Sequence, residues 1–233
     1  MKKISKIIIS VSNGVKREIL RYYDVPEEKI GVIPNGVDLE KFKPNREKRK
    51  KIREKLKIDK NETVLMFSGH KFERKGLRFI IEALPMIKDN VRLLVIGKDS
   101  PELYKKLAQE LKVLDKVIFA GFVPDITEYY AASDIFVFPT AYEAFSLATL
   151  EAVASGLPIL ATKVNGTEEL IMEGYNGFFI RRDPKDIAEK LNILIEDDNL
   201  RKQMSRNARK TAEKYSWDEV AKRTLEVYEE LKK

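Results

Sequence analysis

The chain has 233 residues, 43% of them hydrophobic, and a mean hydropathy of −0.35, which is typical of a globular protein and excludes a disordered or largely membrane-embedded chain. It contains no cysteine and one histidine, His70, so disulfides and thiolate metal sites are excluded and a histidine-based metal centre or catalytic triad is not expected. Charged residues reach 35% with a net charge of +7, a Lys/Glu-rich balance that resembles proteins of heat-loving organisms and is best explained as a solvated surface.

Short apolar and β-branched runs recur along the chain and predict strands. In chain order they cover residues 7–11, 30–33, 63–67, 91–96, 117–119, 135–138, 158–161 and 177–180. Several are apolar at every position, as in strands covered by helices on both faces of a parallel sheet. Amphipathic stretches at 77–87, 101–111 and 147–154 predict helices between them. The predicted fold is therefore α/β, a doubly wound, Rossmann-like parallel sheet.

Two changes in composition mark the limits of this sheet. Residues 44–57 are very basic with few apolar side chains, which predicts a linker or a surface helix. After Asp183 helical sequence runs to the end, with a break at 215–218 where Ser216 and Glu219 have the spacing of a capping box. We therefore divide the chain into residues 1–40, a sheet domain at 41–215 and a C-terminal helix at 216–233.

Ligands of doubly wound sheets bind beyond the carboxyl ends of the strands, so the segments that follow strands are candidate sites. Residues 68–76 follow the strand at 63–67 and combine a turn-forming glycine with cations near a helix N-terminus, namely Gly69, His70, Lys71, Arg74 and Lys75. Cations, unpaired amides and the positive end of a helix dipole suit a diphosphate. On these residues alone, a solvated basic loop is an equal alternative.

A second candidate follows the strand at 135–138. Glu143 precedes a predicted helix, so the amides of Phe145, Ser146 and Leu147 are available to an anion. Glu151 lies in an otherwise apolar part of that helix, where a carboxylate is costly unless a partner satisfies it. From spacing alone, one capping glutamate and one glutamate bonded to backbone explain the pattern equally well.

Two further loops follow strands. Pro124 predicts a helix start and Asp125 its first turn, which is a sufficient structural explanation of residues 121–125. Residues 164–169 again place a glycine and a helix start after a strand.

Together these motifs resemble the signature of glycosyltransferase family four. Glu143 and Glu151 have seven residues between them, in the setting Glu143-Ala144-Phe145-Ser146-Leu147, Leu150-Glu151-Ala152 and Gly156-Leu157-Pro158. Residues 32–38 are similar to the stretch between the two domains of the family, 69–76 to its phosphate loop, 165–169 to its loop before the next helix, and 215–217 to the entry of its final helix. Several ordered matches, covering nearly the whole chain, are more specific than any one of them.

The family consists of retaining enzymes of the GT-B fold. The resemblance implies that this chain is the C-terminal, donor-binding half of a hexosyltransferase, with a helical tail. It would bind a nucleotide diphosphate sugar, UDP- or GDP-linked, for transfer to a hydroxyl acceptor whose identity the sequence does not give. No metal and no cofactor are implied. Residues 1–40 would be the end of the N-terminal acceptor domain and the interdomain linker.

Position by position, the resemblance implies catalytic roles for Glu143 and Lys75. Lys75 would neutralise the diphosphate as the glycosidic bond breaks, and Glu143 would face the sugar and favour an oxocarbenium-like transition state. Glu151 would accept from the ribose hydroxyls. The amides of residues 145–147 would bind phosphate or sugar oxygens, and the backbone of Val123 would contact the base.

The sequence also departs from the family pattern. His70 stands where an arginine is usual, a weaker phosphate partner unless Lys71 or Arg74 compensates. Ala144 and Ser146 stand where glycines are common, which could alter donor preference. Only residues 1–23 could represent the acceptor domain, so the strand at 7–11 would have an exposed edge that invites a partner. That partner would be an N-terminal domain chain or a second copy bound through residues 1–25.

Transfer would depend on such an acceptor domain, because the donor half alone cannot enclose the reacting centre. The alternative is a non-catalytic nucleotide-sugar-binding module or one subunit of a split enzyme. An epimerase or phosphorylase fits the spacing of Glu143 and Glu151 less well, and nucleic-acid binding is not expected because no basic motif interleaved with aromatics occurs. The chain has no apolar run of about 20 residues and no secretory signal, so we expect a cytoplasmic location, including peripheral association with the inner face of the membrane.

Overall fold

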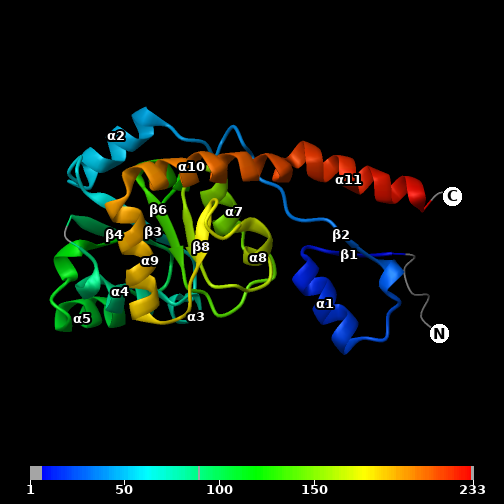
Figure 1. The fold of residues 1–233 in the computed structure, drawn as a ribbon, viewed down its shortest axis with the longest axis horizontal. Helices are drawn as coiled ribbons and strands as arrows, with labels where there is room; N and C mark the ends of the chain where they lie inside the picture. The colour runs from blue at the N-terminus through cyan, green and yellow to red at the C-terminus, as the bar shows by residue number, and fades with distance from the viewer. Residues whose placement is uncertain (1–6, 89, 232–233) are drawn as a thin grey trace.

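The structure is a computed structural model that describes residues 7–88 and 90–231. Its main body is a six-stranded parallel sheet with the strand order β5-β4-β3-β6-β7-β8. The strands are β3 (Thr63–Ser68), β4 (Val91–Ile96), β5 (Val117–Gly121), β6 (Ile135–Phe138), β7 (Ile159–Ala161) and β8 (Gly177–Phe179). Within this sheet the chain begins at the central strand β3, runs outward through β4 to β5, and then returns to β6 on the other side of β3. Strands β3 and β6 lie next to each other in Figure 1. The predicted doubly wound sheet is confirmed, and its order reverses between β3 and β6, where such sheets bind ligands.

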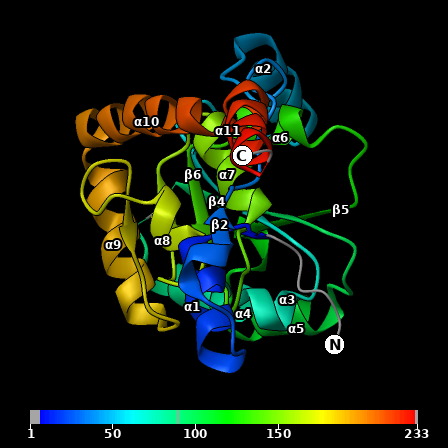
Figure 2. The same cartoon turned by 90° about the vertical axis from the view of Figure 1, so that its right-hand side faces the viewer.

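Helices flank this sheet (Figure 2). They are α3 (Phe72–Lys75), α4 (Leu77–Ala83), α5 (Glu102–Glu110), α6 (Ile126–Ala132), α7 (Leu147–Ala154), α8 (Thr167–Leu170), α9 (Pro184–Glu196) and α10 (Asp198–Ala212). Strands β3 and β6 are buried at every position, as their continuous apolar runs predicted. The helix predicted at 77–87 ends at Ala83 and continues as the 3-10 turn Leu84–Met86, because Pro85 cannot donate the next helical hydrogen bond.

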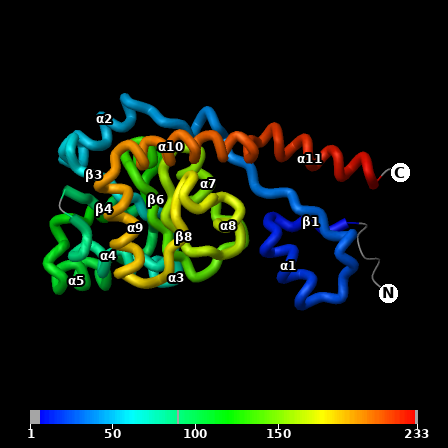
Figure 3. The backbone as a smooth tube through the Cα atoms, in the orientation of Figure 1, coloured from blue at the N-terminus to red at the C-terminus, as the bar shows by residue number. Residues whose placement is uncertain are grey.

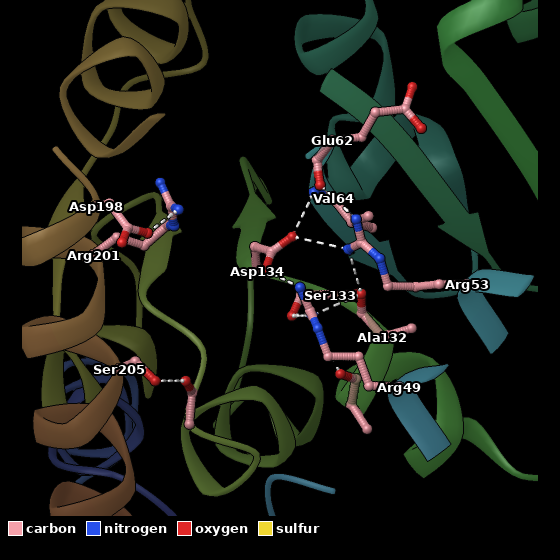
Figure 4. A network of polar contacts seen from close by, with 12 residues as sticks. Arg49, Arg53, Glu62, Val64, Ala132, Ser133, Asp134, Asp198, Arg201 and Ser205 are labelled. Atoms are coloured by element: carbon pink, nitrogen blue, oxygen red, sulfur yellow. Dashed lines mark hydrogen bonds and ion pairs between the residues drawn. The ribbon is translucent and has the colours of Figure 1, made fainter. Parts of the chain in front are cut away.

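The basic stretch at 44–57 contains a surface helix, α2 (Arg46–Lys55), whose N-cap Asn45 accepts from the Lys48 amide. Arg49 and Arg53 point from α2 to Asp134, directly before β6 (Figure 4). The Asp134 carboxylate lies 2.7 Å from Arg49 Nη2 and 3.3 Å from Arg53 Nη1. The positive charge that the sequence concentrates here is therefore used to hold α2 against the sheet.

The N-terminal part forms a separate two-stranded parallel sheet, β1 (Ile8–Ser10) with β2 (Ile30–Val32), beside helix α1 (Asn13–Tyr22). The chain leaves it through residues 33–38 and comes back alongside at 215–217, where the Val37 amide donates to Tyr215 O at 2.8 Å. The predicted cap Ser216 accepts from the Glu219 amide and starts α11 (Trp217–Glu230). This helix runs out beyond the main sheet on the side of the N-terminal part (Figure 3).

The division of the chain at residues 40 and 215 remains a prediction, and its outermost residues, 1–6 and 232–233, lie outside the described residues. Within the described ranges, no helix combines the length and the apolar character needed to cross a bilayer.

Candidate functional site

A cleft of about 410 Å³ lies where the carboxyl ends of β3 and β6 meet. Eight predicted site residues line it: Gly69, His70, Arg74, Lys75, Glu143, Phe145, Ser146 and Leu147. Ser68 and Asn35, from the motifs at 68–76 and 32–38, also line it, as do Phe138, Ala148 and Val11, which the sequence did not single out. Lys71, Val123 and Glu151 are not part of this lining. The fold thus brings the two main candidate loops together at one opening.

The centre of the cleft is an ion pair between Lys75 and Glu143, two side chains that are each about one-tenth exposed. Thr140 Oγ1 donates to the same Glu143 oxygen at 2.9 Å, and Lys75 Nζ lies 5.0 Å from the centre of the Phe138 ring. A cation and a carboxylate held this way are fixed in place before any ligand arrives. Thr140 was not among the predicted site residues.

Gly76 makes this pairing possible. It has φ of +81°, and a Cβ at this position would overlap the carbonyl of Pro139 in the loop after β6. Beside it, the Ala141 amide donates to Arg74 O at 2.9 Å. Only glycine allows such close approach in the left-handed conformation, so it lets the end of α3 reach the Glu143 loop.

The phosphate-loop candidate is braced by the loop after β4. The Phe72 amide donates to Asp99 Oδ2 at 2.7 Å, which fixes the start of α3. The Lys98 amide donates to His70 Nδ1 at 3.3 Å, so in neutral His70 the proton is on Nε2, which becomes a donor. Lys71 is exposed in a left-handed conformation, with φ of 57°. The sequence analysis did not name Lys98 and Asp99. Both follow the strand predicted at 91–96, and this position at the carboxyl edge of the sheet is the signal that could have identified them.

The loop after Glu143 leads into α7. Ser146 has φ of 69°, a left-handed conformation that explains why glycine suits this position, and its hydroxyl accepts from the Thr149 amide at 3.4 Å. Within the part of the chain that the structure describes, the amides of Phe145, Ser146 and Leu147 donate to no other group. The predicted availability of these amides to an anion therefore agrees with the geometry.

Glu151 is half-buried in α7, one helical turn after Leu147 and Ala148 of the cleft lining. Tyr130 of α6 donates its hydroxyl to Glu151 Oε2 at 3.0 Å, so the neighbouring helix provides a partner for the carboxylate. Burial raises the pKa of Glu151, while the Tyr130 hydrogen bond and the charge of Lys41 oppose that shift. Burial, and then the charge of Glu151, raise the pKa of Tyr130 well above its ordinary value. Contact of Glu151 with a ribose stays a prediction.

Val123 is buried in the loop between β5 and α6. Its exposed neighbour Phe122 lies under Lys98, whose Nζ is 4.3 Å from the ring centre. The helix start predicted at Pro124 is wrong by two residues, because α6 begins at Ile126 and Asp125 is its N-cap, accepting from the Thr127 amide at 3.0 Å.

The fold and the position of this cleft at the carboxyl ends of the strands define a Rossmann-like α/β domain. The chain belongs to the family of glycosyl transferases group 1, whose model matches residues 48–211, and residues 2–41 match the model of Glycosyltransferase Family 4. The predicted membership in a family-four glycosyltransferase of the GT-B fold, as its C-terminal domain, is confirmed.

Named relatives agree with this assignment. The chain is 34% identical over 230 residues to an uncharacterized glycosyltransferase of Methanocaldococcus jannaschii, a match that covers 95% of this chain and 59% of the relative. It is 32% identical over 240 residues to the D-inositol 3-phosphate glycosyltransferase of Corynebacterium urealyticum, covering 97% of this chain and 57% of the relative. This chain therefore spans less than two thirds of the length of these relatives.

Solved structures show the same arrangement. A glycosyltransferase from Rickettsia africae superposes with a TM-score of 0.90 at 29% identity, over 98% of this chain and 64% of that one. Anabaena HepE, solved in complex with UDP and glucose, superposes with a TM-score of 0.89 at 25% identity, over 98% of this chain and 64% of that one. The chain thus shares the fold of the matching parts of these longer proteins.

Proposed function

We propose that the cleft binds a nucleotide diphosphate sugar and that this chain is the donor-binding half of a retaining, metal-independent hexosyltransferase. The observation that carries the proposal is the buried pair of Lys75 and Glu143 beside the free amides of residues 145–147. The UDP and glucose bound to Anabaena HepE support a UDP-linked donor.

Each group in the cleft has a separate role in this proposal. Lys75 Nζ and the Nε2–H of His70 supply donors for the diphosphate, whose negative charge grows as the bond to the sugar breaks. The amides before α7 add donors with the positive end of a helix dipole behind them. Glu143 loses part of its pairing when Lys75 turns to the diphosphate. Its negative charge is then available to stabilise the positive charge that develops on the sugar ring.

Calorimetric titration with UDP, GDP, ADP and their sugars, with and without Mg²⁺, tests the proposal. Lys75→Met should weaken binding of the preferred nucleotide diphosphate at least about tenfold, since hydrogen bonds to charged groups contribute about 1.5–3 kcal/mol. The matched control is Lys106→Met, a change on the exposed face of α5. If the parent binds none of these nucleotides, or Lys75→Met binds as tightly as the parent, the assigned site is wrong.

A second candidate function is a subunit of a split enzyme, because β1 pairs only with β2 among the described residues and leaves an edge with which a second chain can pair. A transfer assay separates the two. A subunit binds the donor but transfers sugar only when the N-terminal half of a longer relative is added as a separate chain.

A further inference from the structure

The N-terminal part contacts the main body through α1 and the segment around α8, which lie next to each other in Figure 1. Glu169 Oε1 accepts from the Asn13 amide at 2.7 Å, and Oε2 accepts from Asn13 Nδ2 at 3.1 Å. A carboxylate is thus placed at the first amide of α1, where the helix dipole is positive. Arg17 of α1 forms an ion pair with Glu168.

Shape complementarity adds to these polar contacts. Asn165 donates its side-chain amide to Glu18 at 2.7 Å. The same Asn165 lies so close to the buried Gly14 that a Cβ on Gly14 would overlap its side chain. Gly14 lies inside α1, where alanine favours a helix more than glycine does. Glycine at this position therefore serves the contact with Asn165 at the expense of the helix. We call Asn13, Gly14, Arg17 and Glu18, with Asn165, Glu168 and Glu169, the α1–α8 surface.

The α1–α8 surface connects directly to the cleft. Ser12, the N-cap of α1, is fully buried and donates its hydroxyl at 2.8 Å to the carbonyl of Ala144, the residue that follows Glu143. Val11, one residue earlier, lines the cleft, as does Asn35 from the segment after β2. Whatever fixes α1 therefore also fixes the Glu143 loop and one wall of the cleft.

We propose that the α1–α8 surface positions the donor cleft: by seating Ser12 on Ala144, it holds the Glu143 loop in the conformation that binds the nucleotide sugar. The proposal rests on the function proposed above for that cleft. The residues of the α1–α8 surface are positioning residues, since none of them lines the cleft. Their loss should lower donor affinity without removing any group that touches the ligand.

Gly14→Ala is the sharpest test, because the added methyl group meets Asn165 only when α1 is seated. We expect Gly14→Ala to bind UDP at least about fivefold more weakly than the parent does, which is the lower end of the coupling typical between two sites. Gly31→Ala is the matched control in β2 of the same N-terminal part, where a Cβ meets only Ile7 Cδ1 at 3.6 Å. Gly31→Ala should bind UDP like the parent. Asn165→Gly should restore the affinity of Gly14→Ala, because the clash includes the Asn165 Cβ, which lies 2.8 Å from the position of the added methyl group.

Hydrogen exchange without any ligand separates this proposal from the proposed function. The hydrogen-bonded amides that border the Glu143 loop, those of Ala141, Thr149 and Leu150, should exchange faster in Gly14→Ala than in the parent, and at the parent rate in Gly31→Ala. If the parent binds no nucleotide, the proposed function fails while this exchange comparison still decides the positioning role. Unchanged exchange of these three amides in a folded Gly14→Ala protein, or unchanged UDP affinity, would overturn it.

Discussion

Substitution of Asp134 measures how much its ion pairs with α2 contribute to the stability of the domain. Its carboxylate accepts from Arg49, from Arg53 and, at 2.8 Å, from the Val64 amide at the start of β3 (Figure 4). The Arg53 side chain is 8% exposed, and burial lowers its pKa while the charge of Asp134 opposes that shift. Asp134→Ala leaves this buried cation without its counter-charge.

Removing one partner of a buried ion pair costs about 3–5 kcal/mol. Arg53 keeps hydrogen bonds to the carbonyls of Ala132, Asp59 and Glu62, which favours the lower part of that range. We expect Asp134→Ala to lower the free energy of unfolding by about 3 kcal/mol, a large part of the 5–15 kcal/mol typical of a domain. Asp134→Asn should lose less, because it keeps an oxygen for the Val64 amide.

Urea unfolding followed by circular dichroism measures this loss. Glu128→Ala is the control, since its partner Lys51 also lies on α2 but is 66% exposed, and an exposed pair contributes at most about 1 kcal/mol. Nucleotide affinity should not change in either variant, because Asp134 precedes β6 at the end of the sheet opposite the cleft. Equal small losses for both variants would show that the buried pair does not hold α2 as we reason.

Substitutions at two more positions test details of the site. Burial raises the pKa of Glu151 above its unfolded value, so its contribution to stability is fully present below the unfolded pKa and is lost as the pH rises through the folded pKa. Glu151→Gln should therefore raise the melting temperature relative to the parent more at about pH 8 than at about pH 4, and a difference independent of pH would contradict this. Ser146→Gly and Ser146→Ala both lose the helix cap, but only glycine relieves the left-handed backbone, so the glycine variant should be more stable by about 1–2 kcal/mol in urea unfolding. Equal midpoints would refute the strain argument.

Local patterns predicted the elements well. The strands at 91–96 and 135–138 and the helix at 147–154 match to the residue, because continuous apolar runs and helical periodicity reflect burial directly. The end of α4 was missed because a helical pattern continues past Pro85 while its backbone cannot. The alternation of strands and helices predicted a parallel, doubly wound sheet, whereas the order of its strands came from the structure.

Partners distant in the sequence were not predictable in the same way. Nothing local links Tyr130 to Glu151 or Asp99 to the Phe72 amide, since these contacts exist only after the sheet is assembled. Asn35 reaches the cleft because the N-terminal part is seated beside α8, a placement that depends on Glu169 and its neighbours. The structure places the eight predicted site residues in one cleft, and their roles in binding and catalysis remain predictions.

The junction between the two parts carries a built-in reporter. Trp217, the one tryptophan of the chain, has an indole ring that lies against Gly36, where a Cβ would overlap it. Its fluorescence emission therefore monitors the place where the chain crosses between the parts, while circular dichroism monitors mainly the sheet and its helices. In a urea titration, emission that changes before the dichroism would reveal that the junction opens while the sheet is still folded. Coincident curves would show that the N-terminal part, the junction and the sheet unfold as one cooperative unit.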